Sequence, residues 1–181
     1  LIEDYKNMIT MNFKKKDNIV LIIGKTEGHL DQSVFARDIL NIKNGPPPEI
    51  NLFNEKNNGE TVLSLIKKNL IKAAHDVSLG GIIVAITKMC IKGNKGFKLK
   101  EKKQLINQFQ YLFAEDQGRY VVEIENEKYN QVKEILDKSS VHFDNIGLVT
   151  EKDIIIDDKT MLPIDELANL NNIWLNNYME K

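Results

Sequence analysis

The hydrophobic residues of this chain fall into short clusters whose spacing differs from one cluster to the next. Residues 19–24 form an almost continuous apolar run, which is typical of a strand buried on both faces. Residues 119–125 place Tyr120, Val122 and Ile124 on one side, with the period of two expected of a strand. Further short strands are predicted over residues 73–77, 97–100, 143–149 and 153–156, the last two joined by a short turn.

Other segments have the 3.6-residue period of amphipathic helices. Residues 128–138 are the clearest example, because every third or fourth residue is apolar. Asp31 is placed to cap a helix over residues 32–40, and Pro163 to open the last helix of the chain. The remaining predicted helices cover residues 49–57, 60–69, 80–91 and 103–109.

Strands and helices mingle without strict alternation, so the predicted fold class is α+β. We expect a three-layer α/β/α arrangement, in which a mixed β-sheet is covered by helices on both faces. The strand, helix, strand unit over 119–149 is partly ferredoxin-like. A single domain is expected over residues 1–181, with 1–17 as an incoming segment and 18–181 as the mixed α/β domain.

Composition and charge narrow the classes of function. With 181 residues and 42% hydrophobic content, the chain is long enough to bury a core. The formal net charge of −1 attracts no polyanion, so we expect no nucleic acid partner and interpret the lysine clusters 14–16 and 98–103 as solvated faces. No apolar run approaches the roughly eighteen residues that span a bilayer, and no signal peptide pattern opens the chain. We therefore expect no membrane partner and a cytoplasmic location.

Neither the cysteine nor the isolated histidines indicate a metal site. Cys90 is the one cysteine, which excludes an internal disulfide and a multi-cysteine metal centre. Because it lies on the apolar stripe of helix 80–91, we predict that it packs in the core and is not a catalytic thiol. His29 and His142 have no clustered ligands, so surface or capping roles are expected.

A first polar stretch joins a predicted strand to the helix that follows it, with the sequence His75-Asp76-Val77-Ser78-Leu79-Gly80-Gly81. His75, Asp76 and Ser78 are candidate ligand-binding residues, and Gly80 and Gly81 would let a phosphate approach the positive start of the helix. Simpler interpretations stay open. His75 would then bond a backbone carbonyl, Asp76 and Ser78 would cap the helix, and the two glycines would serve a tight turn.

A second polar stretch precedes another predicted strand, with the sequence Leu112-Phe113-Ala114-Glu115-Asp116-Gln117-Gly118-Arg119-Tyr120. Glu115, Asp116 and Gln117 offer two carboxylates and an amide, which can bind hydroxyls, an amine or a hydrated magnesium ion. The alternative is a solvated polar loop, so whether any residue binds a metal stays unknown. Arg119 is one of two arginines against twenty-three lysines. Its planar fork matches a carboxylate, and we predict that it fixes the geometry of this stretch.

Together these stretches resemble the last domain of the phosphoribosylformylglycinamidine synthase family, the synthetase subunits of purine biosynthesis. Shorter agreements lie at residues 1–4, 19–24, 28–33 and 45–48. The resemblance runs to about residue 147 and implies the three-layer fold of the aminoimidazole ribonucleotide synthetase C-terminal domain. Its motifs are specific to this synthase family within a superfamily that includes selenophosphate synthetase and thiamine monophosphate kinase.

The resemblance implies that the full-length parent is an ATP-dependent carbon-nitrogen ligase. In this family ATP and Mg²⁺ activate the amide oxygen of formylglycinamide ribonucleotide, and ammonia then displaces phosphate to give formylglycinamidine ribonucleotide, ADP and phosphate. The implied partners are the rest of the synthetase chain, a separate glutaminase subunit that supplies ammonia from glutamine, a small accessory subunit and the ribonucleotide substrate.

The same resemblance also limits the role of this chain. The acid-x-Gln stretch of the family's first half belongs to the substrate site, and residues 115–117 match it in the second half, where the pocket is auxiliary. The family's catalytic histidine and main magnesium ligands lie upstream, so we assign no catalytic residue or cofactor to this chain and expect it to be inactive alone. This chain has Leu79 where the family usually has aspartate, which removes a possible ligand. It has Asp31 and Ala114 where the family usually has glycine, and these side chains narrow two points of close approach.

Two other functions stay open. One is a non-catalytic scaffold module that holds at most a structural nucleotide, and the other is a kinase-like or synthetase relative. The motifs at 28–30 and 115–117 count against the kinase-like or synthetase relative. The chain starts at a leucine and resembles the final part of a longer polypeptide. If Lys181 is the natural terminus, the parent is the short bacterial type with separate glutaminase and accessory subunits.

Overall fold

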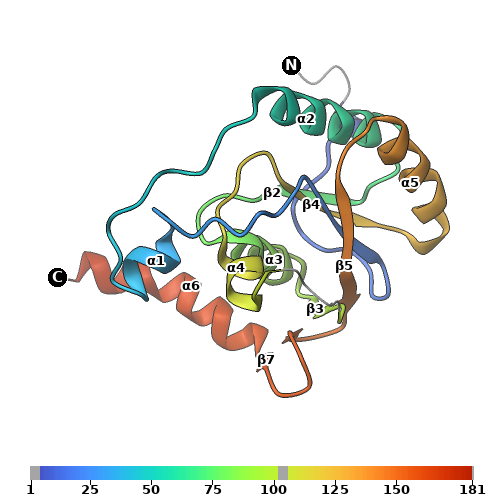
Figure 1. The fold of residues 1–181 in the computed structure, drawn as a ribbon. Helices are drawn as coiled ribbons and strands as arrows, with labels where there is room; N and C mark the ends of the chain where they lie inside the picture. The colour runs from blue at the N-terminus through green and yellow to red at the C-terminus, as the bar shows by residue number, and fades with distance from the viewer. Residues whose placement is uncertain (1–4, 102–105, 181) are drawn as a thin grey trace.

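A mixed sheet runs through the middle of the molecule in this computed structural model, which describes residues 5–101 and 106–180 (Figure 1). Within those residues the sheet has seven strands in the order β2-β4-β1-β5-β3-β6-β7. The strands are β1 (Ile19–Ile23), β2 (Ala73–Asp76), β3 (Gly96–Leu99), β4 (Tyr120–Ile124), β5 (Phe143–Thr150), β6 (Ile154–Ile155) and β7 (Met161–Leu162). Most neighbouring pairs are antiparallel, and β3 pairs with β6 in parallel.

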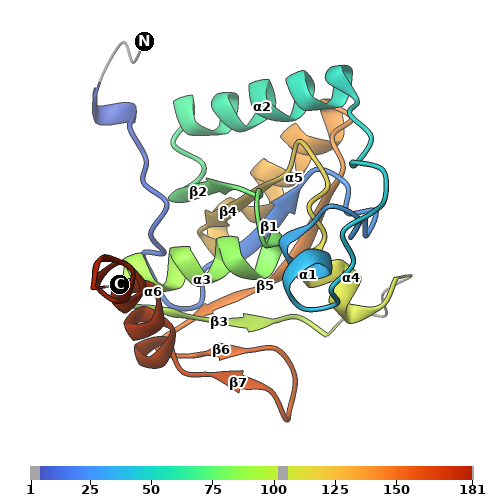
Figure 2. The same ribbon diagram turned by 90° about the vertical axis from the view of Figure 1, so that its left-hand side faces the viewer.

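Helices cover both faces of this sheet, which confirms the predicted three layers (Figure 2). On one face lie α3 (Gly81–Gly93), α4 (Gln108–Phe113) and α6 (Ile164–Met179), and on the other α2 (Leu52–Lys67) and α5 (Tyr129–Lys138). Successive residues of β1 alternate between the two cores: Val20 and Ile22 face α3, whereas Leu21 and Ile23 face α2 and α5. The apolar run at 19–24 is therefore buried on both sides, as its composition predicts.

The ferredoxin-like unit is also present. Strands β4 and β5 are each antiparallel to β1, which lies between them, and α5 connects them across one face. This is a split βαβ arrangement. It places the start of β4 beside the end of β2, so the two polar stretches meet at one edge of the sheet.

Three helices predicted between residues 32 and 69 have different bounds in the structure. Helix α1 (Val34–Asp38) begins after Ser33, whose hydroxyl accepts the amide of Ala36 at 3.0 Å, because Gln32 has φ +62° and cannot be helical. The expected cap Asp31 is not used. The two helices predicted over 49–57 and 60–69 are the single helix α2, which continues through the predicted break.

The region after β3 differs in three ways from the prediction. Residues 103–105 of the helix predicted over 103–109 lie outside the described residues, and α4 begins only at Gln108, where Asn107 and Gln110 form a reciprocal capping box. The strand predicted over 153–156 shortens to β6, which pairs with β3 and not with β5. The hairpin partner β7 was not predicted, because two residues are too few to show a period.

The segment before β1 packs into the domain. Phe13 is buried in the core beneath α3, and the buried Glu123 carboxylate accepts the backbone amides of Lys14 and Lys15 at 2.9 and 3.1 Å. Cys90 is fully buried, as predicted, and burial raises the pKa of its thiol. No helix among the described residues has the length and apolar character needed to cross a bilayer.

Candidate functional site

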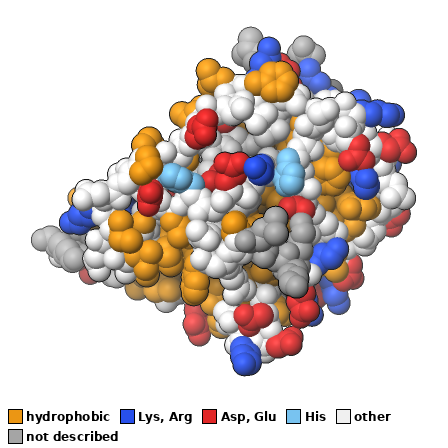
Figure 3. Space-filling model, in the orientation of Figure 1, with side chains coloured by type: hydrophobic (Ala, Val, Ile, Leu, Met, Phe, Trp, Pro, Cys, Tyr) orange, Lys and Arg blue, Asp and Glu red, His pale blue; other side chains and the backbone are white. Residues whose placement is uncertain are grey.

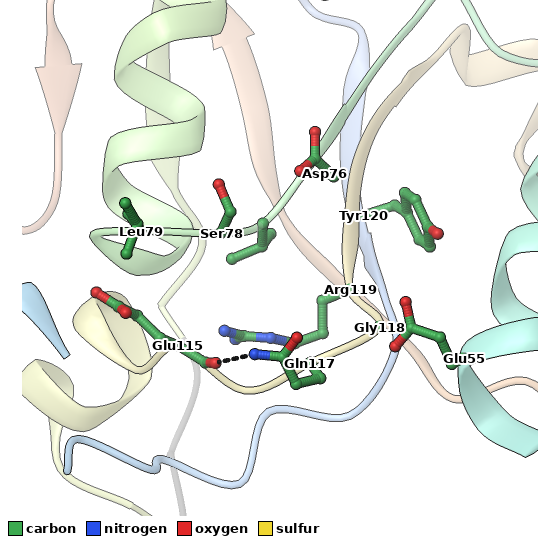
Figure 4. Close-up of a pocket in the computed structure, with 10 residues that line it drawn as sticks. Glu55, Asp76, Ser78, Leu79, Glu115, Gln117, Gly118, Arg119 and Tyr120 are labelled. Atoms are coloured by element: carbon green, nitrogen blue, oxygen red, sulfur yellow. Dashed lines mark hydrogen bonds between the residues drawn. The ribbon is translucent and has the colours of Figure 1, made fainter. Parts of the chain in front are cut away.

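Two adjoining hollows open at the edge of the sheet where β2 and β4 meet. The smaller, of about 250 Å³, lies between the two polar stretches and the start of α2 (Figure 4). The larger, of about 780 Å³, is lined by the loop after β1, the proline segment 46–48 and α2. Glu55, Gln117 and Gly118 line both, so the hollows form one cleft. Figure 3 shows histidine, acidic and basic side chains gathered on one face of the molecule.

The first polar stretch contributes Asp76 and Ser78 to the smaller hollow, but not His75. The His75 ring lies 3.1 Å from the Asp76 carboxylate through Nδ1, and its Nε2 is buried without a hydrogen-bond partner among the described residues. The simple alternatives for these residues do not match the structure. His75 bonds a carboxylate and not a carbonyl, and the residue before α3 is Gly80, with no side chain capping the helix.

The two glycines allow close packing at the start of α3. Gly81 has φ +72°, and a Cβ atom there would lie 2.6 Å from the carbonyl oxygen of Leu112 and 2.7 Å from that of Ala114. The Gly80 amide donates to the Glu115 carboxylate at 2.8 Å, and the Gly81 amide to the Ser78 carbonyl at 3.0 Å. Both predicted phosphate donors therefore have partners within the protein, and neither glycine lines the cleft.

Glu115 links two helix starts. One oxygen of its carboxylate accepts the amide of Val34 in α1 at 2.9 Å and that of Gly80 before α3 at 2.8 Å. Such charge-assisted bonds at helix starts are favourable. Although Glu115 lines the smaller hollow, one carboxylate oxygen is thus bound internally.

Asp116 and Arg119 form a buried strut beneath the cleft. The Asp116 carboxylate accepts three consecutive amides, those of Glu27, Gly28 and His29, at 3.0 to 3.1 Å. The Arg119 guanidinium, which is 1% exposed, donates to the carbonyls of Asp116 and Ala114 and to the Thr26 hydroxyl.

Arg119 has the predicted structural role, but the predicted pairing of its fork with a carboxylate is wrong. Its partners are mainly backbone carbonyls, since its Nη1 lies 3.8 Å from the Asp116 carboxylate. Burial lowers the pKa of Arg119, and Asp116 opposes that effect. The strut joins the loop after β1 to the loop before β4, so it sets the distance between two walls of the cleft.

Several residues that line the cleft were not among the sequence candidates, among them Glu55, Tyr120 and Asn58. Glu55 from α2 faces the smaller hollow beside Gly118, and Tyr120 lies between Glu55 and Asp76 (Figure 4). Burial and these two carboxylates raise the pKa of Tyr120. Asn58 donates to the Gly118 carbonyl at 2.9 Å and lines the larger hollow. Glu55 and Asn58 carry no sequence signal, because they are ordinary polar positions of a helix.

The cleft has more acidic than basic groups. The larger hollow holds Lys25 and the two histidines predicted to be isolated, His29 and His142, but Lys25 is paired with Glu27 at 2.7 Å. His29 bonds the Pro46 carbonyl at 3.0 Å, which holds the proline segment against the hollow. Among the described residues there is no group of three or more His, Cys, Asp or Glu placed to hold a metal ion. The arrangement suits hydroxyl, amide or amine groups better than a phosphate.

Comparison with known sequences places these features in one family. Residues 15–159 match the family described as AIR synthase related protein, C-terminal domain. The chain is 66% identical over 180 residues to the phosphoribosylformylglycinamidine synthase subunit PurL of Pelagibacter ubique, and 35% identical over 179 residues to that of Bartonella henselae. These alignments cover 99% of this chain but only 25% and 24% of those proteins. The chain thus spans about a quarter of the length of these relatives.

Solved structures show the same fold. PurL of Thermotoga maritima complexed with FGAR matches 90% of this chain and 30% of its own, with a TM-score of 0.74 at 20% sequence identity. The hydrogenase maturation protein HypE of E. coli matches 86% of this chain and 51% of its own, with a TM-score of 0.59. The predicted fold class is therefore confirmed.

Proposed function

The chain belongs to the family of AIR synthase related proteins, C-terminal domain, and from this premise we propose that it is the C-terminal domain of a phosphoribosylformylglycinamidine synthase. The single observation that carries the proposal is the 66% identity to PurL of Pelagibacter ubique over 99% of this chain. Because the matched region covers 99% of this chain, it includes the cleft and the final helix. The activity belongs to the parent, of which this chain is one domain.

The proposed reaction is an ATP-dependent ligation. The γ-phosphoryl group of ATP passes to the amide oxygen of formylglycinamide ribonucleotide, and ADP leaves. Ammonia then adds to the activated carbon, and phosphate departs with that oxygen to leave the amidine. Solved relatives named as complexes with ATP and with FGAR support nucleotide and substrate binding in the parent.

The described residues do not fit a magnesium-nucleotide site of their own. The amides of Gly80 and Gly81 are already bonded, the Arg119 donors point into the protein, and the described residues form no metal-binding group. We therefore assign no step of the reaction to a residue of this chain. ATP and Mg²⁺ are proposed for the parent, with their ligands on other domains.

The cleft is proposed as an auxiliary ligand pocket of the parent. Asp76, Ser78 and Gln117 line the smaller hollow and are the residues proposed to meet a ligand, while Glu115 and Asp116 hold the loops that shape it. His75 supports Asp76 from behind through its 3.1 Å contact. In this proposal the residues nearest the ligand come from the two polar stretches, and Glu55 of α2 forms a third side.

Growth complementation and enzyme assay test the proposal. The full reading frame that contains this segment is expressed in a bacterium that lacks its own synthase, and we expect growth without added purine. The purified parent should release ADP only when FGAR and ammonia are both supplied. ADP release that is independent of FGAR, or failure of a well-folded parent to complement, would contradict the proposal.

A purely structural role is the second candidate, favoured by one observation: most polar groups of the two motifs bond within the domain. Calorimetry distinguishes the two. Titration of the 181-residue chain with ATP-magnesium, and separately with FGAR, gives heat from at least one if the pocket binds a ligand. No heat from either, with the chain shown to be folded, favours a scaffold.

Partners and location follow from the same proposal. We propose that the parent works with a separate glutaminase subunit and a small accessory subunit in the cytoplasm. A solved assembly named PurLQS from Thermotoga maritima contains a chain of this fold, which supports a multi-subunit complex. Co-purification of a tagged parent with a glutaminase-active subunit would test it.

A further inference from the structure

The last helix of the chain extends beyond the domain that it belongs to (Figures 1 and 2). Helix α6 is anchored at its start, where Ile164 is buried and Leu167 packs against the core beside α3. From Asn169 to Glu180 every residue is exposed. About two thirds of this helix is therefore exposed in the described structure.

The apolar face that anchors α6 continues along its exposed part. Trp174, Leu175 and Tyr178 follow Ile164 and Leu167 at helical spacing, so they lie on the same side of the helix. They are 59%, 49% and 68% exposed, and the rings of Trp174 and Tyr178 lie 6.4 Å apart. The end of the helix thus presents a row of large apolar side chains to solvent.

This part of the helix has little intrinsic stability. Residues 167–179 contain no charged side chain, so no i,i+4 ion pair supports the helix. Five of them are asparagine, which has a low helix propensity. Isolated helices shorter than about 12–15 residues are marginal in water, and most helical stability in proteins comes from packing of an apolar face. The exposed part of α6 needs a surface to pack against.

We infer that residues 169–179 dock on another domain of the same polypeptide; this inference rests on the proposed function. The relatives that match this chain over 99% of its length are about four times as long, so in them a neighbouring domain is always tethered nearby. The family match ends at residue 159, before α6, whereas the matches to the longer relatives cover 99% of the chain.

Size favours a tethered domain over a second copy of the chain. The exposed part of α6 is about 16 Å long and about 10 Å wide, whereas a stable interface between separate proteins buries roughly 800 Å² on each partner. A tethered domain is held at an effective concentration in the millimolar range, so a small apolar contact suffices. The absence of charge also suits a permanent contact, because such interfaces are more apolar than transient ones.

Two equally exposed leucines provide a matched test. Leu175 on α6 and Leu63 on α2 are both 49% exposed. Leu175→Gln and Leu63→Gln are made both in the 181-residue chain and in the full parent. Amide hydrogen exchange of residues 169–179 and the melting temperature are measured for all forms.

In the 181-residue chain we expect residues 169–179 to exchange rapidly and neither substitution to move the melting temperature. In the parent, these amides should exchange at least about tenfold more slowly, and Leu175→Gln, but not Leu63→Gln, should remove that protection. Equal exchange in both contexts would overturn the inference. Protection in the 181-residue chain that grows with its concentration would also overturn it, in favour of a second copy. A parent that shields α6 but lacks ligase activity would leave this inference standing and count against the proposed function.

Discussion

The two polar stretches both combine acidic side chains with glycines but differ in how their side chains are used. In the stretch from His75 to Gly81, Asp76 is two-thirds exposed and its one side-chain contact is with the neighbouring ring. In the stretch from Leu112 to Tyr120, by contrast, the polar groups of Glu115, Asp116 and Arg119 hold three loops together. Both stretches line the smaller hollow, but the second also holds the surrounding loops together.

The difference shows why an acid beside a glycine is a weak indication of ligand binding. A buried carboxylate is stable when several donors satisfy it, and the loops around a pocket supply such donors in their backbone amides. A residue that shapes a pocket and one that binds in it can therefore have the same sequence context. Substitutions distinguish them, because structural residues change stability and ligand-facing residues do not.

The largest effect is expected at Arg119. Arg119→Ala removes three hydrogen bonds and leaves the Asp116 carboxylate without its buried cation, so unfolding should become easier by about 3–5 kcal/mol. Urea unfolding followed by circular dichroism measures the change. Arg37→Ala is the control, since that exposed arginine pairs with Asp38 at the surface and its loss should leave the midpoint unchanged. Equal effects of both substitutions would contradict the strut.

Gly81→Ala should be the next most damaging change. A side chain at φ +72° is strained, and its Cβ would overlap the carbonyls of Leu112 and Ala114, so a loss of about 2–3 kcal/mol is expected. Gly59→Ala in α2 is the comparison, because its Cβ would meet only the Tyr120 hydroxyl at 3.3 Å. Thermal unfolding of both variants decides whether the double glycine is needed for packing.

Within the second stretch, Glu115 and Gln117 should behave differently. Glu115→Ala leaves the amides of Val34 and Gly80 without their acceptor, at a cost of about 1–3 kcal/mol. Gln117→Ala removes only a local 3.2 Å bond to the Glu115 carbonyl, and we expect no change in stability. Chemical denaturation checks both, and a destabilising Gln117→Ala would show that the whole stretch is structural.

The smallest effect is expected at Asp76. Asp76→Asn should leave the unfolding midpoint unchanged but lower the pKa of Tyr120 towards its ordinary value, because one of the two carboxylates that disfavour the tyrosinate is lost. Ultraviolet titration of the tyrosines measures this, with Tyr120→Phe identifying the signal. An unmoved Tyr120 titration would place Asp76 outside the smaller hollow in solution.

The strands and helices with a clear period were predictable from the sequence. Strands β1 and β4 and helices α3 and α5 lie within one or two residues of their predicted bounds. The predicted break in α2 failed because Asn57, Asn58 and Gly59 have the composition of a turn. In the folded chain Asn58 bonds the Gly118 carbonyl and Gly59 makes room for Tyr120, so contacts with β4 override local preference.

The two sequence stretches that contribute to the candidate site were predictable, but which of their side chains face the cleft and which bond within the protein was not. The sequence alone determined the layered fold and the two glycine-flanked motifs, because hydrophobic period and turn residues act locally. Only the tertiary structure decided that Glu115 and Asp116 bond inward, that His75 turns away from the cleft and that Glu55 enters it. Those outcomes depend on which backbone amides lie within hydrogen-bond distance, and such amides belong to segments more than thirty residues away in the chain.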